Sequence, residues 1–179
     1  MKRFKRILAT TDLTPESLSA VSYAAHLASA HEARMLVLHV PTSTAALYAE
    51  FLPPIDIAGV DEAVEVSARQ HLEKWAHRNL ADMHGIELLV RSGHASDTIC
   101  RVAAEWNANL IVMATHGRKG LGHFALGSVT EQVLRNAPCP VLTVNPWARK
   151  KDLTVRAARA AVDQRRGRKD VDGPAHHAG

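Results

Sequence analysis

The sequence predicts an α/β fold in which a parallel sheet is covered by helices on both faces. Short aliphatic runs, such as Met35–Val40 and Leu110–Ala114, alternate along the chain with longer segments of helical periodicity. Runs that are apolar at every position, rather than at every second one, are typical of strands buried on both faces. Parallel neighbours need right-handed crossovers, and these crossovers place helices on either side of the sheet.

Each element is expected from a local pattern. A first strand is expected at Arg6–Thr10, and Thr14-Pro15 has the pattern of an N-cap followed by proline at the first helical position. Gly85 is expected to end the second helix. The other strands are expected at Met35–Val40, Ile86–Val90, Leu110–Ala114 and Val141–Val144, and the other helices at Ala63–Met83, Ala95–Trp106 and Ser128–Asn136.

Length and charge divide the chain into a body and a tail. A chain of 179 residues suits one domain, expected at 1–146, plus a basic C-terminal extension at 147–179 that is flexible or partly helical. Residues 1–148 hold thirteen Lys/Arg and fourteen Asp/Glu, whereas residues 149–179 hold nine and four. Residues 149–179 contain no Phe, Trp or Tyr. We therefore expect the tail to make a weak electrostatic contact at most, with plain disorder as the alternative.

Hydropathy and cysteine content indicate a cytoplasmic protein without a membrane partner. No apolar run approaches the ~20 residues of a membrane-spanning helix, and the apolar stretch near the N-terminus is too short for a signal peptide. Cys100 and Cys139 are the only cysteines, so no disulfide framework is expected. Cys100 is expected in the core-facing part of a helix and Cys139 in a turn between two prolines, so neither is expected to be a nucleophile.

Ligands of such sheets bind beyond the carboxyl ends of the strands, where the strand order reverses. The residues that follow the expected strands are therefore the first candidates for a site: Thr11-Asp12, His39–Pro41, Arg91–Gly93 and Thr115–Gly117. The connection Pro41–Asp61 is long, and both a lid over a ligand and an ordinary loop are open interpretations.

A glycine-rich segment between Ala114 and Ser128 follows a strand and opens a helix, which is a favourable place for phosphate. It is not a P-loop, because Val129 follows Ser128 and the lysine is missing. It is not the dinucleotide fingerprint either, because Ala125 stands where the third glycine belongs. The spacing that remains is Ala114-x2-Gly117-x9-Gly127-Ser128.

In this spacing the chain resembles the ATP-binding branch of the universal stress protein family, which has Gly-x2-Gly-x9-Gly-Ser/Thr in this place. Ile7–Asp12 is similar to the opening strand and aspartate of the family, and Ala137–Val144 to its closing strand. The resemblance covers about residues 3–145. The chain departs from the pattern at Ala114, whose methyl group could crowd a phosphate or require a different backbone angle.

The resemblance implies a Rossmann-like domain with a five-stranded parallel sheet in the order 3-2-1-4-5. It implies that Asp12 binds the ribose hydroxyls and that the backbone near Val40 meets adenine. It also implies that Gly117, Gly127, Ser128 and Val129 hold the phosphates through their backbone N–H groups, with Ser128 adding a hydroxyl. ATP would bring Mg (or Mn), held mainly by phosphate oxygens. The implied cofactor-binding residues are Thr11, Asp12, Val40, Met113, Ala114, His116, Gly117, Gly127, Ser128 and Val129.

Several of these features also have interpretations that need no ligand. Ser128-x-x-Glu131 has the spacing of a capping box, and Asp12 suits a turn. His39 and His116 both follow strands, but no third ligand supports a metal site there. Ser96 and Asp97, near His94, suit the first turn of a helix rather than a catalytic set.

The leading functional hypothesis is an ATP-binding stress or regulatory factor with little or no ATP hydrolysis. One alternative is a scaffold of the same fold that does not bind nucleotide, which Ala114 favours. Another is a slow phosphotransfer or adenylating enzyme, for which fold analogy is the sole support. The last strand should be an edge strand, and the family commonly dimerises there, so a homodimer is expected through Val141, Leu142, Thr143 and Val144.

Overall fold

The computed structural model describes residues 3–41, 57–81, 85–115 and 127–146. All the helices and strands expected from the sequence are present, with small shifts at some ends. The strands are β1 (Arg6–Thr11), β2 (Arg34–His39), β3 (Ile86–Val90), β4 (Leu110–Ala114) and β5 (Val141–Val144), and the helices are α1 (Pro15–His31), α3 (Ile57–Leu80), α4 (Ala95–Glu105) and α5 (Ser128–Asn136).

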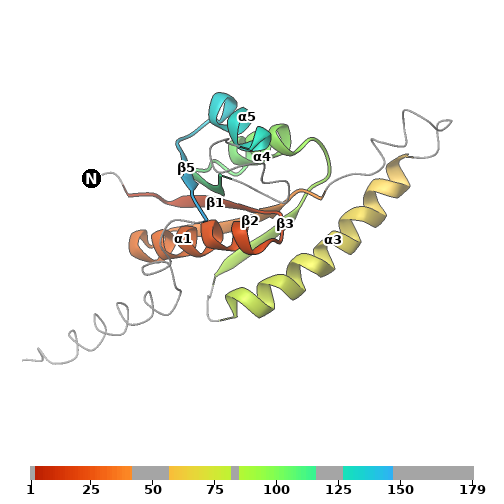
Figure 1. Ribbon diagram of the computed structural model, residues 1–179, viewed down its shortest axis with the longest axis horizontal. Coiled ribbons are helices and arrows are strands. Elements are labelled where there is room, and N and C mark those ends of the chain that lie inside the picture. Colours follow the sequence, from red (N-terminus) through yellow and green to blue (C-terminus); the bar gives the residue numbers. More distant parts are fainter. Residues whose placement is uncertain (1–2, 42–56, 82–84, 116–126, 147–179) are drawn as a thin grey trace, which may run out of the picture.

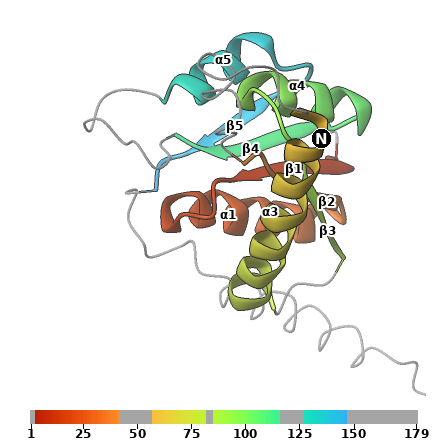
Figure 2. The same cartoon turned by 90° about the vertical axis from the view of Figure 1, so that its right-hand side faces the viewer.

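The predicted sheet is confirmed. Its five strands are all parallel, in the order β3-β2-β1-β4-β5, and Figure 1 shows them beside α1 and α3. In Figure 2 the sheet is seen between two layers, with α1 and α3 on one face and α4 and α5 on the other. The strand order reverses between β1 and β4, so the carboxyl ends of these two strands border the switch point where ligands of such sheets bind.

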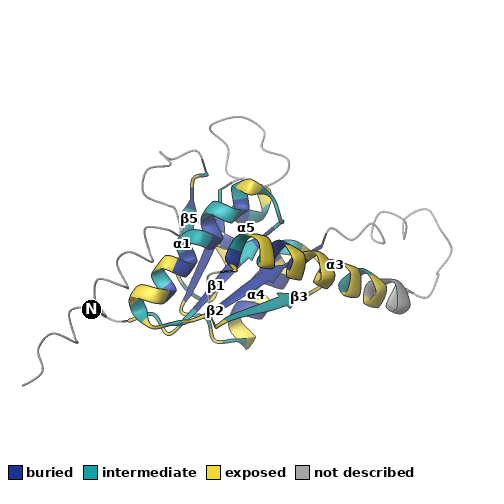
Figure 3. Ribbon diagram, turned by 90° about the horizontal axis from the view of Figure 1, so that it is seen from below, coloured by how far each residue is buried: buried dark blue, intermediate teal, exposed yellow. Residues whose placement is uncertain are grey.

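Two apolar clusters fill the space between the sheet and its helices, as the buried ribbon segments in Figure 3 illustrate. Successive residues of β1 point to opposite faces: Ile7 belongs to the cluster under α1 and α3, and Leu8 to the cluster under α4 and α5. Trp75 of α3 is one of the few aromatic side chains in the chain, and it is buried in the first cluster. Aliphatic residues and alanine therefore fill most of both layers, as the composition predicts.

Helix α3 begins earlier than expected. It starts at Ile57 rather than Ala63, so the expected connection Pro41–Asp61 ends in helix. The first buried side chain described on α3 is Ala68, and Figure 1 shows the preceding turns extending past the sheet. An apolar stripe marks where a helix contacts a core, so the pattern could not locate a start in turns that lie beyond the core.

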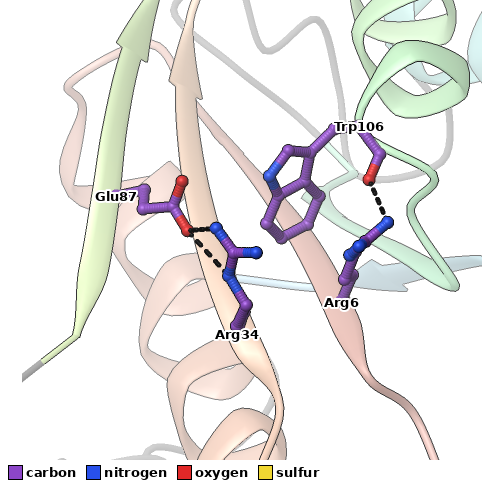
Figure 4. A network of polar contacts seen from close by, with 4 residues as sticks. All are labelled: Arg6, Arg34, Glu87 and Trp106. Carbon is purple, nitrogen blue, oxygen red and sulfur yellow. Dashed lines mark hydrogen bonds and ion pairs between the residues drawn. The ribbon is translucent and has the colours of Figure 1, made fainter.

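A polar network joins three strands and the end of α4 at the amino edge of the sheet (Figure 4). The guanidinium of Arg34 donates to Glu87 Oε1 from Nε (3.1 Å) and Nη2 (2.7 Å), and it lies 6.0 Å from the ring centroid of Trp106. Arg6 Nη1 donates to the Trp106 carbonyl oxygen over 3.2 Å. Ion pairs this exposed contribute little stability. Because this network occupies the amino edge, the opposite, carboxyl edge is the place to look for a ligand.

Candidate functional site

The structure brings most of the predicted site residues to the carboxyl edge of the sheet. Thr11 ends β1, Asp12 follows it, and Val40 follows β2, whose last residue lies opposite Thr11 in the β1–β2 register. On the other side of β1, the pairing with β4 ends with Ala9 opposite Val112, and β1 and β4 each continue for two more residues, to Thr11 and Ala114. The end of β4 therefore lies beside the end of β1, although the sequence separates them by about a hundred residues.

Asp12 has a local role in the turn between β1 and α1. Its Oδ1 accepts hydrogen bonds from the backbone N–H and the hydroxyl of Thr14. Thr14 in turn is the N-cap of α1, and its hydroxyl oxygen accepts from the Ser17 N–H over 3.3 Å. The turn interpretation of Asp12 is therefore correct, and any ligand contact would be made by a carboxylate that this turn already holds in place.

The turn is strained and held from several directions. Leu13 has φ +66°, a left-handed conformation that costs a side-chain-bearing residue roughly 1–2 kcal/mol. Its N–H donates to Thr11 Oγ1 over 3.0 Å, and Thr11 Oγ1 lies 2.9 Å from Ser17 Oγ. Strain of this kind persists where surrounding contacts fix the backbone, and it is often found at functional sites.

His39 connects the end of β2 to the end of β1. The residue is buried, with 7% of its surface exposed, and its Nδ1 lies 2.8 Å from the carbonyl oxygen of Thr11. A carbonyl oxygen can only accept, so Nδ1 carries the hydrogen. The sequence places His39 on the ligand side of the sheet but does not reveal this contact.

The N-terminus of α5 is not capped by a side chain. Gly127 is the N-cap, Ser128 is the first helical residue, and no side-chain cap hydrogen bond is present. The capping-box interpretation of Ser128 and Glu131 is therefore wrong, because it requires the serine itself at the N-cap. The first bond within the helix runs from the Glu131 N–H to the Gly127 carbonyl. The amides of residues 128–130 thus have no acceptor within the helix, which makes this end a favourable place for an anion.

Two hydrogen bonds fix the start of α5 on the end of β4. The Gly127 N–H donates to the Thr115 carbonyl oxygen over 3.0 Å, and Thr130 Oγ1 donates to the Ala114 carbonyl oxygen over 3.1 Å. Gly127 has φ −60°, so it is not needed for a left-handed turn. A Cβ there would lie 3.3 Å from the Thr115 oxygen, so glycine allows this close approach. Its own amide already bonds Thr115, which leaves Ser128 and Val129 as the stronger candidates for phosphate.

The side chains of the remaining predicted residues point away from the edge. Met113 is 4% exposed and belongs to the cluster under α4 and α5, and Val129 is half-buried against the same cluster. Ala114 packs against the other cluster, under α1 and α3. Any ligand contact of Met113 and Val129 would therefore be made through the backbone. His116, Gly117, residues 42–56 of the long connection Pro41–Asp61 and the tail at 147–179 lie outside the described residues.

The group near the start of α4 does not have the geometry of a catalytic triad. His94 Nδ1 lies 3.0 Å from Ser96 Oγ and 3.5 Å from Asp97 Oδ2, so both neighbours use the same ring nitrogen. A triad needs the two partners on opposite nitrogens. Ser96 is also 1% exposed and lies 2.6 Å from Gln132 Oε1. The Ser96–Gln132 contact joins α4 to α5, and Ser96 and Asp97 lie in the first turn of α4, as the sequence predicts.

Metal and thiol chemistry find little support in the described part of the chain. No three side chains of His, Cys, Asp or Glu gather there in a way that could hold a metal ion. Cys100 and Cys139 are free thiols, and burial, the largest cause for each, raises the pKa of both. A raised pKa lowers the thiolate fraction, which is opposite to what a nucleophile needs.

One hollow in the described part of the chain lies away from these residues. A depression of about 470 Å³ runs beside the part of α3 that extends past the sheet, and its described lining is Glu62, Ala63, Val66, Ser67 and Gln70. It is open, and its described walls come from one helix. A ligand pocket normally encloses its ligand with convergent groups from several elements, so the candidate site remains the carboxyl edge. Thr130 and Ser17 were not predicted from the sequence, and both hold the backbone at this edge: Thr130 by its hydrogen bond to the Ala114 carbonyl oxygen and Ser17 by its contact with Thr11 Oγ1.

No described helix combines the length and the hydropathy needed to cross a bilayer. Comparison with known proteins gives relatives over most of the chain. "Universal stress protein A homolog 1" of Coxiella burnetii is 33% identical over 79% of this chain and 96% of its own. The solved "hypothetical protein MJ0577" is 23% identical, with a TM-score of 0.66 over 84% of this chain and all of its own. A universal stress protein solved in complex with cAMP is 24% identical, with a TM-score of 0.57 over 81% of this chain and 99% of its own. The model of the universal stress protein family matches residues 3–145, and the chain belongs to that family.

Proposed function

We propose that this protein binds ATP, with a divalent cation, at the carboxyl edge of the sheet and acts as a nucleotide-responsive regulatory factor. The observation that carries the proposal is the start of α5. Its first three amides have no acceptor within the helix and no side-chain cap, and it is fixed on the end of β4, next to the strand that leads into Asp12. Such an N-terminus attracts phosphate through its exposed N–H groups and its dipole.

The ribose would bind at Asp12. A carboxylate can accept hydrogen bonds from two neighbouring hydroxyls, and the Thr14 N–H and hydroxyl hold this one at the end of β1. The base would lie toward Val40, the residue that directly follows β2, the strand next to β1. The family relative solved with cAMP supports adenine nucleotides as the ligand class.

The cation would come with the nucleotide. Mg²⁺ commonly binds substrate phosphates together with one or two carboxylates, so the described residues need not form a metal cage of their own. Thr11, Ala114, His116 and Gly117 complete the proposed lining.

Little hydrolysis is expected. The segment before α5 lacks the lysine of a P-loop, and phosphoryl transfer depends on such positioned charges and on a group that orients water. Nucleotide would instead favour one conformation or assembly, which partners would recognise. A second copy of the chain is the proposed first partner, because β5 lies at the edge of the sheet with its outer side unpaired by any described strand. Both cysteines are free thiols, which favours the cytoplasm as the compartment.

Calorimetric titration of ATP-Mg and of cAMP into protein freed of nucleotide tests the proposal. We expect micromolar binding of ATP-Mg that Asp12→Ala weakens by roughly 10-fold or more, as expected for a charge-assisted hydrogen bond. Asp12→Asn keeps an oxygen that can accept from Thr14 but removes the charge, so it shows whether the loss of binding comes from the turn or from the contact with the ligand. Asp97→Asn, an exposed aspartate in the first turn of α4, is the matched control. Absence of bound nucleotide and of heat with both ligands would contradict the proposal.

A further inference from the structure

We infer that His39 is a positioning residue for the nucleotide site: it fixes the end of β1 and thereby the direction of the Asp12 carboxylate. The inference rests on the proposed function for the nucleotide, whereas the contact made by His39 is seen in the structure. Imidazole Nδ1 of His39 lies 2.8 Å from the carbonyl oxygen of Thr11, the residue directly before Asp12.

The contact lies where the strand ladder gives way to the turn. Thr11 and His39 are the last residues of β1 and β2 and lie opposite each other in the register. Beyond Thr11, the backbone enters the left-handed conformation at Leu13. Here a side chain from the neighbouring strand holds the carbonyl group at which β1 leaves the sheet.

The hydrogen bonds described above for Thr11 Oγ1 and Asp12 Oδ1 are local to the turn and the start of α1. The hydroxyl of Thr11 accepts from the Leu13 N–H and lies 2.9 Å from Ser17 Oγ, and Asp12 Oδ1 accepts from Thr14. These bonds shape the turn and dock it on α1. The His39 bond differs because it ties the turn to β2, the strand that leads into Val40. It therefore fixes the spacing between the proposed ribose side and the proposed base side of the site.

The tautomer of His39 follows from the same contact. The carbonyl oxygen has no hydrogen to give, so Nδ1 donates whether the ring is neutral or charged. Burial, with 7% of the residue's surface exposed, shields the bond from competition by water. An asparagine can reproduce this donor because its Nδ2 is also bonded to Cγ, whereas a glutamine places its amide one carbon further out.

The test compares His39→Asn with His39→Gln, two amides that differ in where the N–H lies, and adds His39→Leu, which has no donor. For ATP-Mg binding by calorimetry we expect His39→Asn to remain within about 3-fold of the wild type and His39→Gln and His39→Leu to lose about 5-fold or more. In an Asp12→Ala background the loss from His39→Gln should shrink to below about 2-fold, because a residue that acts through Asp12 couples to it. Equal affinities for the Asn and Gln variants, or the same loss in both backgrounds, would overturn the inference.

Hydrogen exchange provides a measurement that does not need nucleotide. The Leu13 and Thr14 amides should exchange about 5-fold faster or more in His39→Gln than in His39→Asn, because their acceptors lie on the turn that His39 holds. The Thr98 amide, which bonds the His94 carbonyl in α4, is the reference and should not change. If the wild type binds no ATP, the proposed function fails, and this comparison still decides whether His39 holds the turn. Equal exchange in the two variants would refute the role of His39.

Discussion

Replacing Ser128 by proline would remove one backbone N–H from the start of α5 without disturbing the helix. Ser128 is the first helical residue and is exposed, and proline is well tolerated at this position because its fixed φ suits the helix and the amide has no partner within it. The residue before a proline must be extended, and Gly127 already is, with φ −60° and ψ 145°. The chain itself provides a precedent, since Pro15 opens α1.

The size of the effect follows from what each substitution removes. Ser128→Ala removes the hydroxyl and keeps the amide, whereas Ser128→Pro removes both. A hydrogen bond to a charged group contributes roughly 1.5–3 kcal/mol, so loss of an amide–phosphate bond should weaken ATP-Mg binding about 10-fold to 100-fold between the two variants. The free energy of unfolding in the absence of nucleotide should be nearly the same in both.

Calorimetric titration of both variants with ATP-Mg, alongside thermal unfolding without ligand, measures the two quantities. Ala95→Pro is the matched control: it removes the amide at the first position of α4, where the N-cap His94 is also extended and uses no side-chain cap. It should leave ATP affinity within about 2-fold, since α4 is not expected to contact phosphate. If Ser128→Pro bound ATP-Mg as tightly as Ser128→Ala, the start of α5 would not be the phosphate site.

Two further predictions concern the thiols and the assembly. Burial raises the pKa of Cys100 and Cys139, so their alkylation by iodoacetamide at pH 7.5 should be slower than that of a cysteine peptide, and the rate should rise as the pH passes 9. The variants Cys100→Ser and Cys139→Ser separate the rates of the two thiols. A rate like that of the peptide at pH 7.5 would show that the thiols are not shielded. Sedimentation equilibrium should give about twice the chain mass of 19.5 kDa. The Pro140 and Val144 carbonyls accept from β4 and the residue after it, so the Thr143 N–H between them faces away from β4, and Thr143→Pro should shift the mass toward the monomer while leaving the β4–β5 pairing intact. A monomeric wild type at micromolar concentration would count against pairing through β5.

The sequence predicts the strands better than the start of α3, and the reason is physical. A buried parallel strand is a short, mostly aliphatic run bounded by polar, glycine or proline residues, and β3, β4 and β5 begin and end where such runs do. The beginning of α3 has no comparable signal, because its described turns before Ala68 bury no side chain. The strand order is a different matter: it came from the family resemblance, because the spacing of aliphatic runs does not determine which strands are neighbours.

For the site, residue types were predictable and contacts were not. Ser-x-x-Glu is the same pattern whether the serine lies at the N-cap or one position later, and only the backbone shows that Gly127 is the N-cap. The contact between His39 and Thr11 depends on the register of two strands, which sequence spacing does not determine. The position of Asp12 directly after β1 was predictable, because it follows the short aliphatic run that forms this strand. Its turn role and its proposed ribose role both follow from that position.

The departure from the family pattern at Ala114 weighs less against nucleotide binding in the structure than in the sequence. Ala114 is an ordinary residue of β4 and pairs with Val144, and it is not among the described residues with a positive φ, so its backbone does not require glycine. Its side chain packs against the cluster under α1 and α3, whereas α5 lies on the other face of the sheet. The methyl group is therefore on the face opposite to the proposed phosphate amides. The scaffold hypothesis, which depended on a clash between this methyl group and a phosphate, loses the observation that favoured it.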